Sequence, residues 1–335
     1  MKIIQIAVAV AAAALPAAAQ VQLTGAGATF PAPIYQKWFS EYASKGVQIN
    51  YQPIGSGGGI RGINEGTVDF GASDMPLDAQ QLKNFKDKHG YDLLMLPTVV
   101  GAAVPVYNLP RVTAALRFTG DALAGIYLGK ITMWNAPELK AANPGVNLPA
   151  QKIVVVHRSE GSGTTFCFTD YLSKVNAGWA AVGKNTSVNW PVGIGAKGND
   201  GVAGMIRQQK GAIGYVELIY AVNNHLPYGL VRNKAGQFVK ADIASVGAAA
   251  ASVTELPPDL GISITDAPGK DAYPISTYTW LLVPSKIEDA QKRQAIKGFL
   301  KWAITSGQSE VGALDYVPLP KAVVAAEEKQ IARIQ

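Results

Sequence analysis

Three glycine-rich segments, each directly before a helical pattern, carry the residues best suited to chemistry. They are residues 25–31, 55–59 and 158–165. A helix N-terminus leaves backbone N–H groups without partners and carries partial positive charge, and glycine lets a ligand approach that backbone closely. Serine and threonine hydroxyls in the same segments add neutral donors. Each segment is therefore a candidate anion site, although each taken singly is also explained as a tight turn capped by a hydroxyl.

Arg158 sharpens the anion hypothesis for the third segment. Its guanidinium can present a planar fork of donors to two oxygens of one ligand. Glu160 follows two residues later and could pair with Arg158 at the surface. It could equally fix the guanidinium beside a ligand and reduce its net charge, so both interpretations stay open.

Asp74 ends a strand-like run and supplies a carboxylate where an anion is expected. This makes sense if the ligand carries a proton, because hydrogen phosphate can donate it and fully ionised sulfate cannot. Sulfate would set lone pairs against a desolvated carboxylate. Sites built to bond a ligand hydrogen can reject an analogue without it by roughly 10⁴–10⁵. The alternative is that Asp74 is a turn residue before Pro76.

The elements around these segments predict an α/β protein with mostly parallel sheets, because short apolar runs alternate with helical patterns. The helical patterns cover residues 34–42, 200–209 and 287–305, and Thr29 and Pro31 are expected as N-cap and first residue of the first helix. In such a fold the three turns gather beyond the carboxyl ends of the strands. The predicted strands are residues 47–51, 67–72, 152–157, 212–217 and 278–284.

The length of 335 residues predicts two domains, because single cores stop growing at roughly 250–300 residues. Two long apolar stretches, residues 94–107 and 273–283, are candidates for strands that cross between them. We expect lobe I to contain residues 20–104 and 274–335, and lobe II, residues 105–273, to be inserted within it.

The N-terminus reads as a secretory signal peptide, residues 1–19, cleaved near Ala19. Lys2 precedes an apolar run too short to span a bilayer. The full sequence carries a formal charge of +6 without a cluster of Lys and Arg, so no nucleic-acid partner is expected. Cys167 is the single cysteine, which excludes an internal disulfide.

Three other functions are alternatives to a binding protein for phosphate. A dinucleotide-binding enzyme is disfavoured because the G-x-G-x-x-G spacing at residues 57–62 recurs at 193–198, as chance allows with 35 glycines. A secreted phosphatase needs a nucleophile with a base, or metals, and the three histidines show no metal-ligand spacing. A receptor for sulfate or molybdate shares the binding mode but is disfavoured by Asp74.

Taken together, these segments resemble the periplasmic phosphate-binding proteins of bacterial high-affinity phosphate ABC transporters. The resemblance implies a mixed α/β fold of the periplasmic-binding-protein type (type II-like), with two lobes that close on phosphate about a hinge. It also implies a monomeric periplasmic protein, without catalytic residues, cofactor or metal, that delivers phosphate to a membrane permease and an ATPase. The matching stretches are residues 23–33, 54–59, 67–74, 126–131, 161–164, 197–201 and 211–216.

The resemblance also assigns the phosphate ligands, with Asp74 as acceptor of the phosphate proton and Arg158 as charged donor. Two departures affect residues beside the ligand: Gly57 stands where a second serine is frequent, and Glu160 stands where a shorter Asp is familiar. The longer Glu160 puts the affinity in question more than the specificity. The complete implied set is Thr29, Phe30, Ser56, Asp74, Arg158, Ser162, Gly163 and Thr164.

Overall fold

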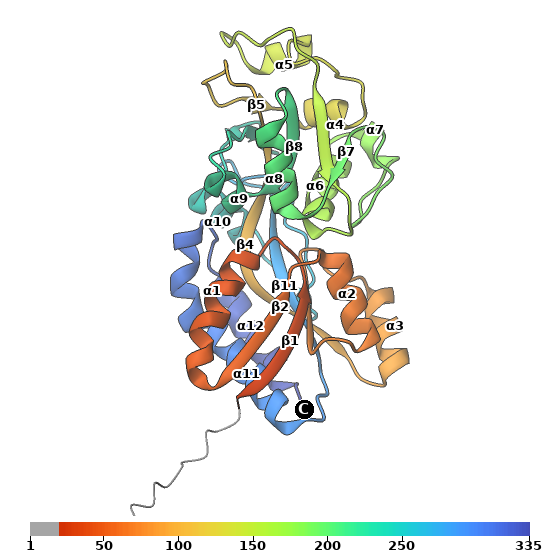
Figure 1. Ribbon diagram of the computed structural model, residues 1–335, viewed down its shortest axis with the longest axis vertical. Coiled ribbons are helices and arrows are strands. Elements are labelled where there is room, and N and C mark those ends of the chain that lie inside the picture. The colour runs from red at the N-terminus through yellow and green to blue at the C-terminus, as the bar shows by residue number, and fades with distance from the viewer. Residues whose placement is uncertain (1–19) are drawn as a thin grey trace, which may run out of the picture.

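The computed structural model describes residues 20–335, so the predicted signal peptide lies outside the described residues. Two lobes are stacked along the long axis of the molecule (Figure 1). The chain begins and ends in the same lobe, where β1 lies near α11 and α12, while α4, α5 and α6 belong to the other lobe. No helix within residues 20–335 is long and apolar enough to cross a membrane.

One mixed sheet runs through both lobes in the order β2-β1-β3-β11-β4-β8-β6-β7, and a small second sheet has the order β10-β9-β5. Within the large sheet, β1 is parallel to β2 and β3, and β6 is parallel to β7 and β8. The two central strands are antiparallel to their neighbours. The strands are β1 (Val21–Gly27), β2 (Val47–Gln52), β3 (Phe70–Ser73), β4 (Leu93–Tyr107), β5 (Arg117–Phe118), β6 (Val154–Arg158), β7 (Ile194–Ala196), β8 (Ala212–Glu217), β9 (Leu230–Arg232), β10 (Phe238–Val239) and β11 (Ser276–Pro284).

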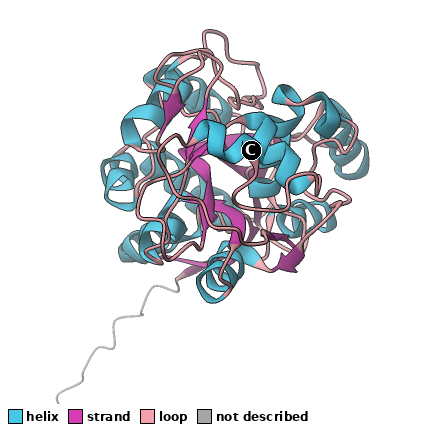
Figure 2. Ribbon diagram, turned by 90° about the horizontal axis from the view of Figure 1, so that it is seen from above, coloured by secondary structure: helices cyan, strands magenta, loops and turns pink. Residues whose placement is uncertain are grey.

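Helices surround these strands when the molecule is seen from above (Figure 2). The first helix packs through an apolar face that includes the buried residues Ile34, Tyr35 and Trp38. The helices are α1 (Ala32–Tyr42), α2 (Ser56–Glu65), α3 (Ala79–His89), α4 (Gly120–Tyr127), α5 (Pro137–Ala142), α6 (Gly163–Val175), α7 (Ala177–Ala180), α8 (Gly198–Gln208), α9 (Leu218–Asn223), α10 (Ile243–Ala251), α11 (Ala290–Ile304) and α12 (Lys321–Ala332), with 3₁₀ turns η1 (Ala43–Lys45) and η2 (Ser306–Leu314).

Strand β4 connects the two halves of the large sheet. All fifteen of its residues are buried, as expected for an apolar run between covered faces. Its first part pairs with β11 up to Ala102, and its last part, Ala103 to Tyr107, pairs with β8. The structure therefore joins the lobes by continuous strand rather than by a flexible linker.

The predicted elements are present, and their ends differ for local reasons. The strand predicted at residue 67 begins at Phe70, because Thr67 N–H donates to Gly62 O and closes helix α2. The helix predicted at residue 287 begins at Ala290, because Asp289 caps it and accepts from the N–H of Gln291 at 2.8 Å.

Candidate anion-binding site

The three glycine-rich turns meet in one place, as the sequence predicts. Each follows the carboxyl end of a strand: β1 leads to α1, β2 to α2 and β6 to α6. The second and third turns touch directly, since Gly57 N–H donates to Gly161 O at 2.9 Å. Gly163 N–H, at the start of α6, donates to Ser56 Oγ at 3.0 Å. The first turn joins them through α8, where Asn199 Nδ2 donates to Thr29 Oγ1 at 2.8 Å.

Glycine is required at position 55, where the second turn meets the third, and the space at position 57 is tight. Gly55 has φ +93°, and a Cβ there would lie 2.6 Å from Gly161 O. A Cβ at Gly57 would lie 3.0 Å from Gly161 Cα. Both positions therefore face the opposing turn, and a side chain at residue 57 would require Gly161 to shift by a few tenths of an ångström.

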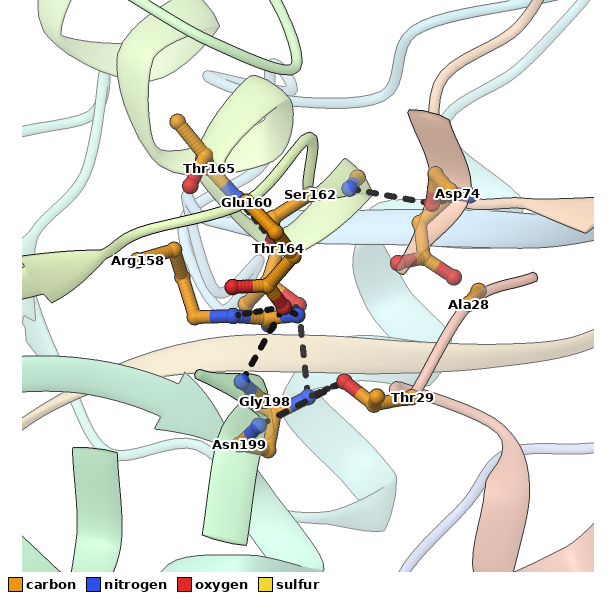
Figure 3. Close-up of polar contacts among 12 residues, drawn as sticks. Ala28, Thr29, Asp74, Arg158, Glu160, Ser162, Thr164, Thr165, Gly198 and Asn199 are labelled. Atoms are coloured by element: carbon orange, nitrogen blue, oxygen red, sulfur yellow. Dashed lines mark hydrogen bonds and ion pairs between the residues drawn. The ribbon is translucent and has the colours of Figure 1, made fainter. Parts of the chain in front are cut away.

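Arg158 is held from two sides within the site (Figure 3). Its Nε donates to Glu160 Oε1 at 2.9 Å, its Nη2 forms an ion pair with the same oxygen, and its Nη1 donates to Thr164 Oγ1 at 3.3 Å. Glu160 Oε1 also accepts from Gly198 N–H at 3.0 Å. Burial opposes ionisation of Glu160, but the hydrogen bond and charge of Arg158 outweigh it and lower its pKa. Glu160 therefore orients the guanidinium.

Asp74 lies on the opposite side of the site from Arg158 (Figure 3) and is buried. Its Oδ1 accepts from Thr279 Oγ1 at 2.7 Å, and its backbone carbonyl accepts from Thr277 Oγ1 at 3.3 Å. Burial raises the pKa of Asp74 to about 7, although Thr279 and the charge of Arg158 lower it. The carboxyl group is thus poised to change protonation near neutral pH.

The hydroxyl groups of the site are arranged as donors. Ser56 Oγ accepts from the N–H of Gly163 and, at 3.3 Å, from the N–H of Asp74. Thr164 Oγ1 accepts from Arg158, and Ser162 Oγ caps α6 by accepting from Thr165 N–H at 3.1 Å. Because their lone pairs face N–H groups, their own hydrogens remain available for another acceptor. Apart from Glu160, which is paired with Arg158, the site presents many donors and one carboxylate, that of Asp74, which suits a partly protonated oxyanion.

The predicted helix cap in the first turn is wrong. Thr29 is not the N-cap of α1: the cap position is Pro31, without a side-chain hydrogen bond, and the helix begins at Ala32. The Thr29 hydroxyl instead faces Asn199 across the site. The neighbouring Phe30 is fully buried, and its carbonyl accepts from Tyr316 Oη at 2.6 Å, which fixes the backbone of this turn.

Two polar residues of the site are not predicted from their own sequence context. Thr279 lies in β11, and its position gives no sign that it will bond to Asp74. Asn199 lies in residues 197–201, which entered only as one of the matching stretches. The sequence does carry one signal for it, a glycine-flanked start to a helix like those of the other turns.

Comparison with known proteins agrees with this geometry. Residues 12–306 match the family model described as a PBP superfamily domain. The chain is 47% identical over 308 residues to the phosphate-binding protein PstS of Xylella fastidiosa, covering 91% of this chain and 83% of the relative. It is 43% identical over 320 residues to PstS of Haemophilus influenzae, covering 94% of each.

Solved structures share the fold. A high affinity periplasmic phosphate-binding protein bound with phosphate superposes with a TM-score of 0.74 at 23% identity, covering 91% of this chain and 92% of the other. A phosphate-binding protein from Stenotrophomonas maltophilia gives 0.71 at 20% identity, covering 92% and 93%. From the family model and the close relatives, this chain belongs to the PBP superfamily and, within it, to the PstS family of phosphate-binding proteins.

Proposed function

We propose that this protein binds inorganic phosphate between its two lobes and delivers it to a membrane ABC transporter. The observation that carries the proposal is the buried carboxylate of Asp74 set against Arg158 and a ring of hydroxyl and amide donors. Hydrogen phosphate satisfies both kinds of group, because it offers lone pairs to the donors and one hydrogen to Asp74. Sulfate or molybdate, as full dianions, would leave Asp74 facing lone pairs.

Each side chain has a distinct proposed role. Arg158 contributes charge, Asp74 accepts the phosphate hydrogen, and the start of α6 contributes amides and the helix dipole. Glu160 supports Arg158, and Gly57 allows the turns to meet. The proposed ligands are the hydroxyls of Thr29, Ser56, Ser162 and Thr164, the N–H groups of Phe30 and Gly163, the Arg158 guanidinium and the Asp74 carboxylate.

Binding without catalysis is the proposal, in keeping with a family of substrate-binding proteins. Ser162 is engaged as the cap of α6. The ring of His157 stacks on Trp190 at 4.8 Å between centroids, with Nδ1 3.0 Å from Arg158 O. His89 Nε2 lies 2.9 Å from Asn64 O. These contacts favour structural roles for both histidines over the role of a general base.

The proposed mechanism is closure of the lobes about the crossing strands. Lobe I comprises residues 20–104 and 274–335, and lobe II comprises residues 105–273. Ligands from both lobes favour the closed state, so phosphate shifts the population towards it. We further propose that the mature protein is a periplasmic monomer, released by cleavage near Ala19, and that the permease and ATPase subunits recognise its closed form.

Calorimetric titration of phosphate-stripped protein tests the proposal. We expect tight, stoichiometric binding of phosphate and little heat with sulfate at pH 8. Tight sulfate binding, or none with phosphate, would overturn it. A turnover assay on a phosphomonoester, with Ser162→Ala as control, tests the rival enzyme: robust activity lost in the variant would reject a pure binding protein.

A further inference from the structure

Asn199 bridges the two sides of the candidate site from the first turn of α8. Its side chain is completely buried. Its Nδ2 donates to Thr29 Oγ1 at 2.8 Å and lies 3.4 Å from Thr164 Oγ1 (Figure 3). Thr29 belongs to the turn after β1, whereas Thr164 and Asn199 lie in α6 and α8 of the other lobe. One amide group therefore contacts two proposed phosphate ligands, one in each lobe.

The orientation of this amide is fixed by a hydrogen bond to the backbone of β8. Asn199 Oδ1 accepts from the backbone N–H of Glu217 at 2.9 Å, at the end of β8. A backbone N–H can only donate, so the oxygen of the amide must face Glu217 and the NH₂ group must face the two threonines. A rotated amide would leave the buried N–H of Glu217 without an acceptor, which is costly.

The fixed amide determines which way the threonine hydroxyls point. Thr29 Oγ1 accepts from Asn199 Nδ2 and, more weakly at 3.4 Å, from Asn199 N–H. Thr164 Oγ1 accepts from Arg158 and faces the same Nδ2. With their lone pairs turned towards these N–H groups, both hydroxyls must direct their hydrogens elsewhere, and the anion is the acceptor within the site.

We propose that Asn199 is a positioning residue that sets both threonine hydroxyls as donors to the anion and fastens the lobes in the closed state. This inference rests on the proposed function and deepens it. Because this bond joins segments of the two lobes that, in the proposed function, close around the ligand, it should stabilise the complex after encounter. Asn199 therefore acts mainly on the rate of phosphate release.

Asn199→Asp is the decisive variant. It keeps the acceptor for Glu217 but replaces the NH₂ donor with a second carboxylate oxygen, which reverses the polarity of both hydroxyls and adds charge beside a dianion. We expect phosphate to bind about 100-fold more weakly, with the loss in the dissociation rate and a nearly unchanged association rate. Asn199→Ala, which removes the bond without the charge, should lose about tenfold. Stopped-flow and calorimetric measurements report both values.

Asn143→Asp is the matched control. Asn143 is also buried and also binds backbone groups, but its partners Arg117 and Leu139 lie within one lobe. We expect this variant to melt at a lower temperature and to bind phosphate as wild type does. A merely structural Asn199 would behave in the same way, with lower stability and unchanged release rate.

A double-mutant cycle with Thr29→Val separates positioning from general damage, and it works even if Asn199→Asp folds poorly. If Asn199 acts through the Thr29 hydroxyl, Asn199→Ala should cost little more affinity once that hydroxyl is gone. Additive losses, or wild-type release rates in the Asn199 variants, would overturn the inference while phosphate binding by the wild type stands. A wild type that binds no phosphate would instead overturn the proposed function.

Discussion

Gly163, the first residue of helix α6, lies directly against Asp74: a Cβ at position 163 would sit 2.6 Å from Asp74 Cβ and 2.6 Å from Asp74 Oδ2. The two residues lie far apart in the chain, in segments that we assign to different lobes. The absence of a side chain at Gly163 therefore lets the N-terminus of α6 approach the carboxylate, so that both can act on the same ligand.

Gly163→Ala should weaken phosphate binding about 10- to 100-fold, because overpacking a close contact costs about 1–3 kcal/mol and the cost falls on the closed state. The substituted backbone is not strained, since residue 163 is the first residue of a helix without positive φ. Titration calorimetry measures the affinity. Small-angle scattering should show a larger radius of gyration in saturating phosphate than for wild type.

Gly204→Ala in α8 is the control, because a Cβ there meets nothing within 4 Å. It should stabilise the helix by about 0.5–1 kcal/mol and leave the affinity unchanged. If Gly163→Ala binds and closes as wild type does, the contact with Asp74 is not a feature of the ligand-bound state.

Asp74→Asn should reduce the preference for phosphate over sulfate more than it reduces anion binding as a whole. The amide can donate to an anion oxygen and no longer repels a fully ionised ligand, so the ratio of sulfate to phosphate dissociation constants should fall at least about 100-fold. Competition of sulfate against labelled phosphate measures this ratio.

Asp170→Asn is a useful comparison for that experiment. Asp170 is also a buried carboxylate, but it pairs with Lys184 and Lys174 within one lobe. The variant should lower stability and leave the selectivity intact. Equal losses for both anions in Asp74→Asn would contradict the role of Asp74 as acceptor of the ligand hydrogen.

Selectivity should also depend on pH, because burial raises the pKa of Asp74 to about 7 in the unliganded protein. Above this pH the carboxylate repels sulfate; below it the protonated group can donate to a sulfate oxygen. If sulfate binds only the protonated form, its apparent dissociation constant should rise about tenfold per pH unit above 7. Calorimetry from pH 5 to 8.5 tests this, and Asp74→Asn should abolish the slope. A flat profile in the wild type would refute the assignment.

The sequence predicts those parts of the site whose residues are neighbours in the chain, and it does not predict contacts between distant residues. The turns at Ser56 and Ser162 can be predicted from the sequence, because the glycines, the hydroxyl residue and the start of the helix are adjacent in the chain. The bonds of Thr29 to Asn199 and of Asp74 to Thr279 join residues 170 and 205 positions apart, and nothing near either partner encodes them. The sequence predicts a cap at Thr29 because its local context suits one, whereas in the structure its hydroxyl accepts from the distant amide of Asn199.

A buried carboxyl group on helix α12 leads to a prediction about stability rather than about binding. Glu327 lies on this face between Val323 and Ile331, is fully buried, and neither of its carboxyl oxygens has a hydrogen-bond partner among residues 20–335. Glu327→Met, of similar length and good helix propensity, should stabilise the protein by about 1–3 kcal/mol, because it removes an unsatisfied buried polar group. The exposed neighbour Glu328→Met should change the free energy of unfolding little.

The gain from Glu327→Met should grow with pH. Burial raises the pKa of Glu327 in the folded protein well above its usual value, whereas in the unfolded chain it ionises near pH 4.3. Below that pH both states are protonated, and the wild type has its full stability. As pH rises towards the folded pKa the unfolded chain releases the proton first, so the free energy of unfolding of the wild type falls. Chemical denaturation at pH 4 and pH 8 checks this, and a gain that is equal at both values, or larger at pH 4, would show that Glu327 is ionised and satisfied in the folded protein.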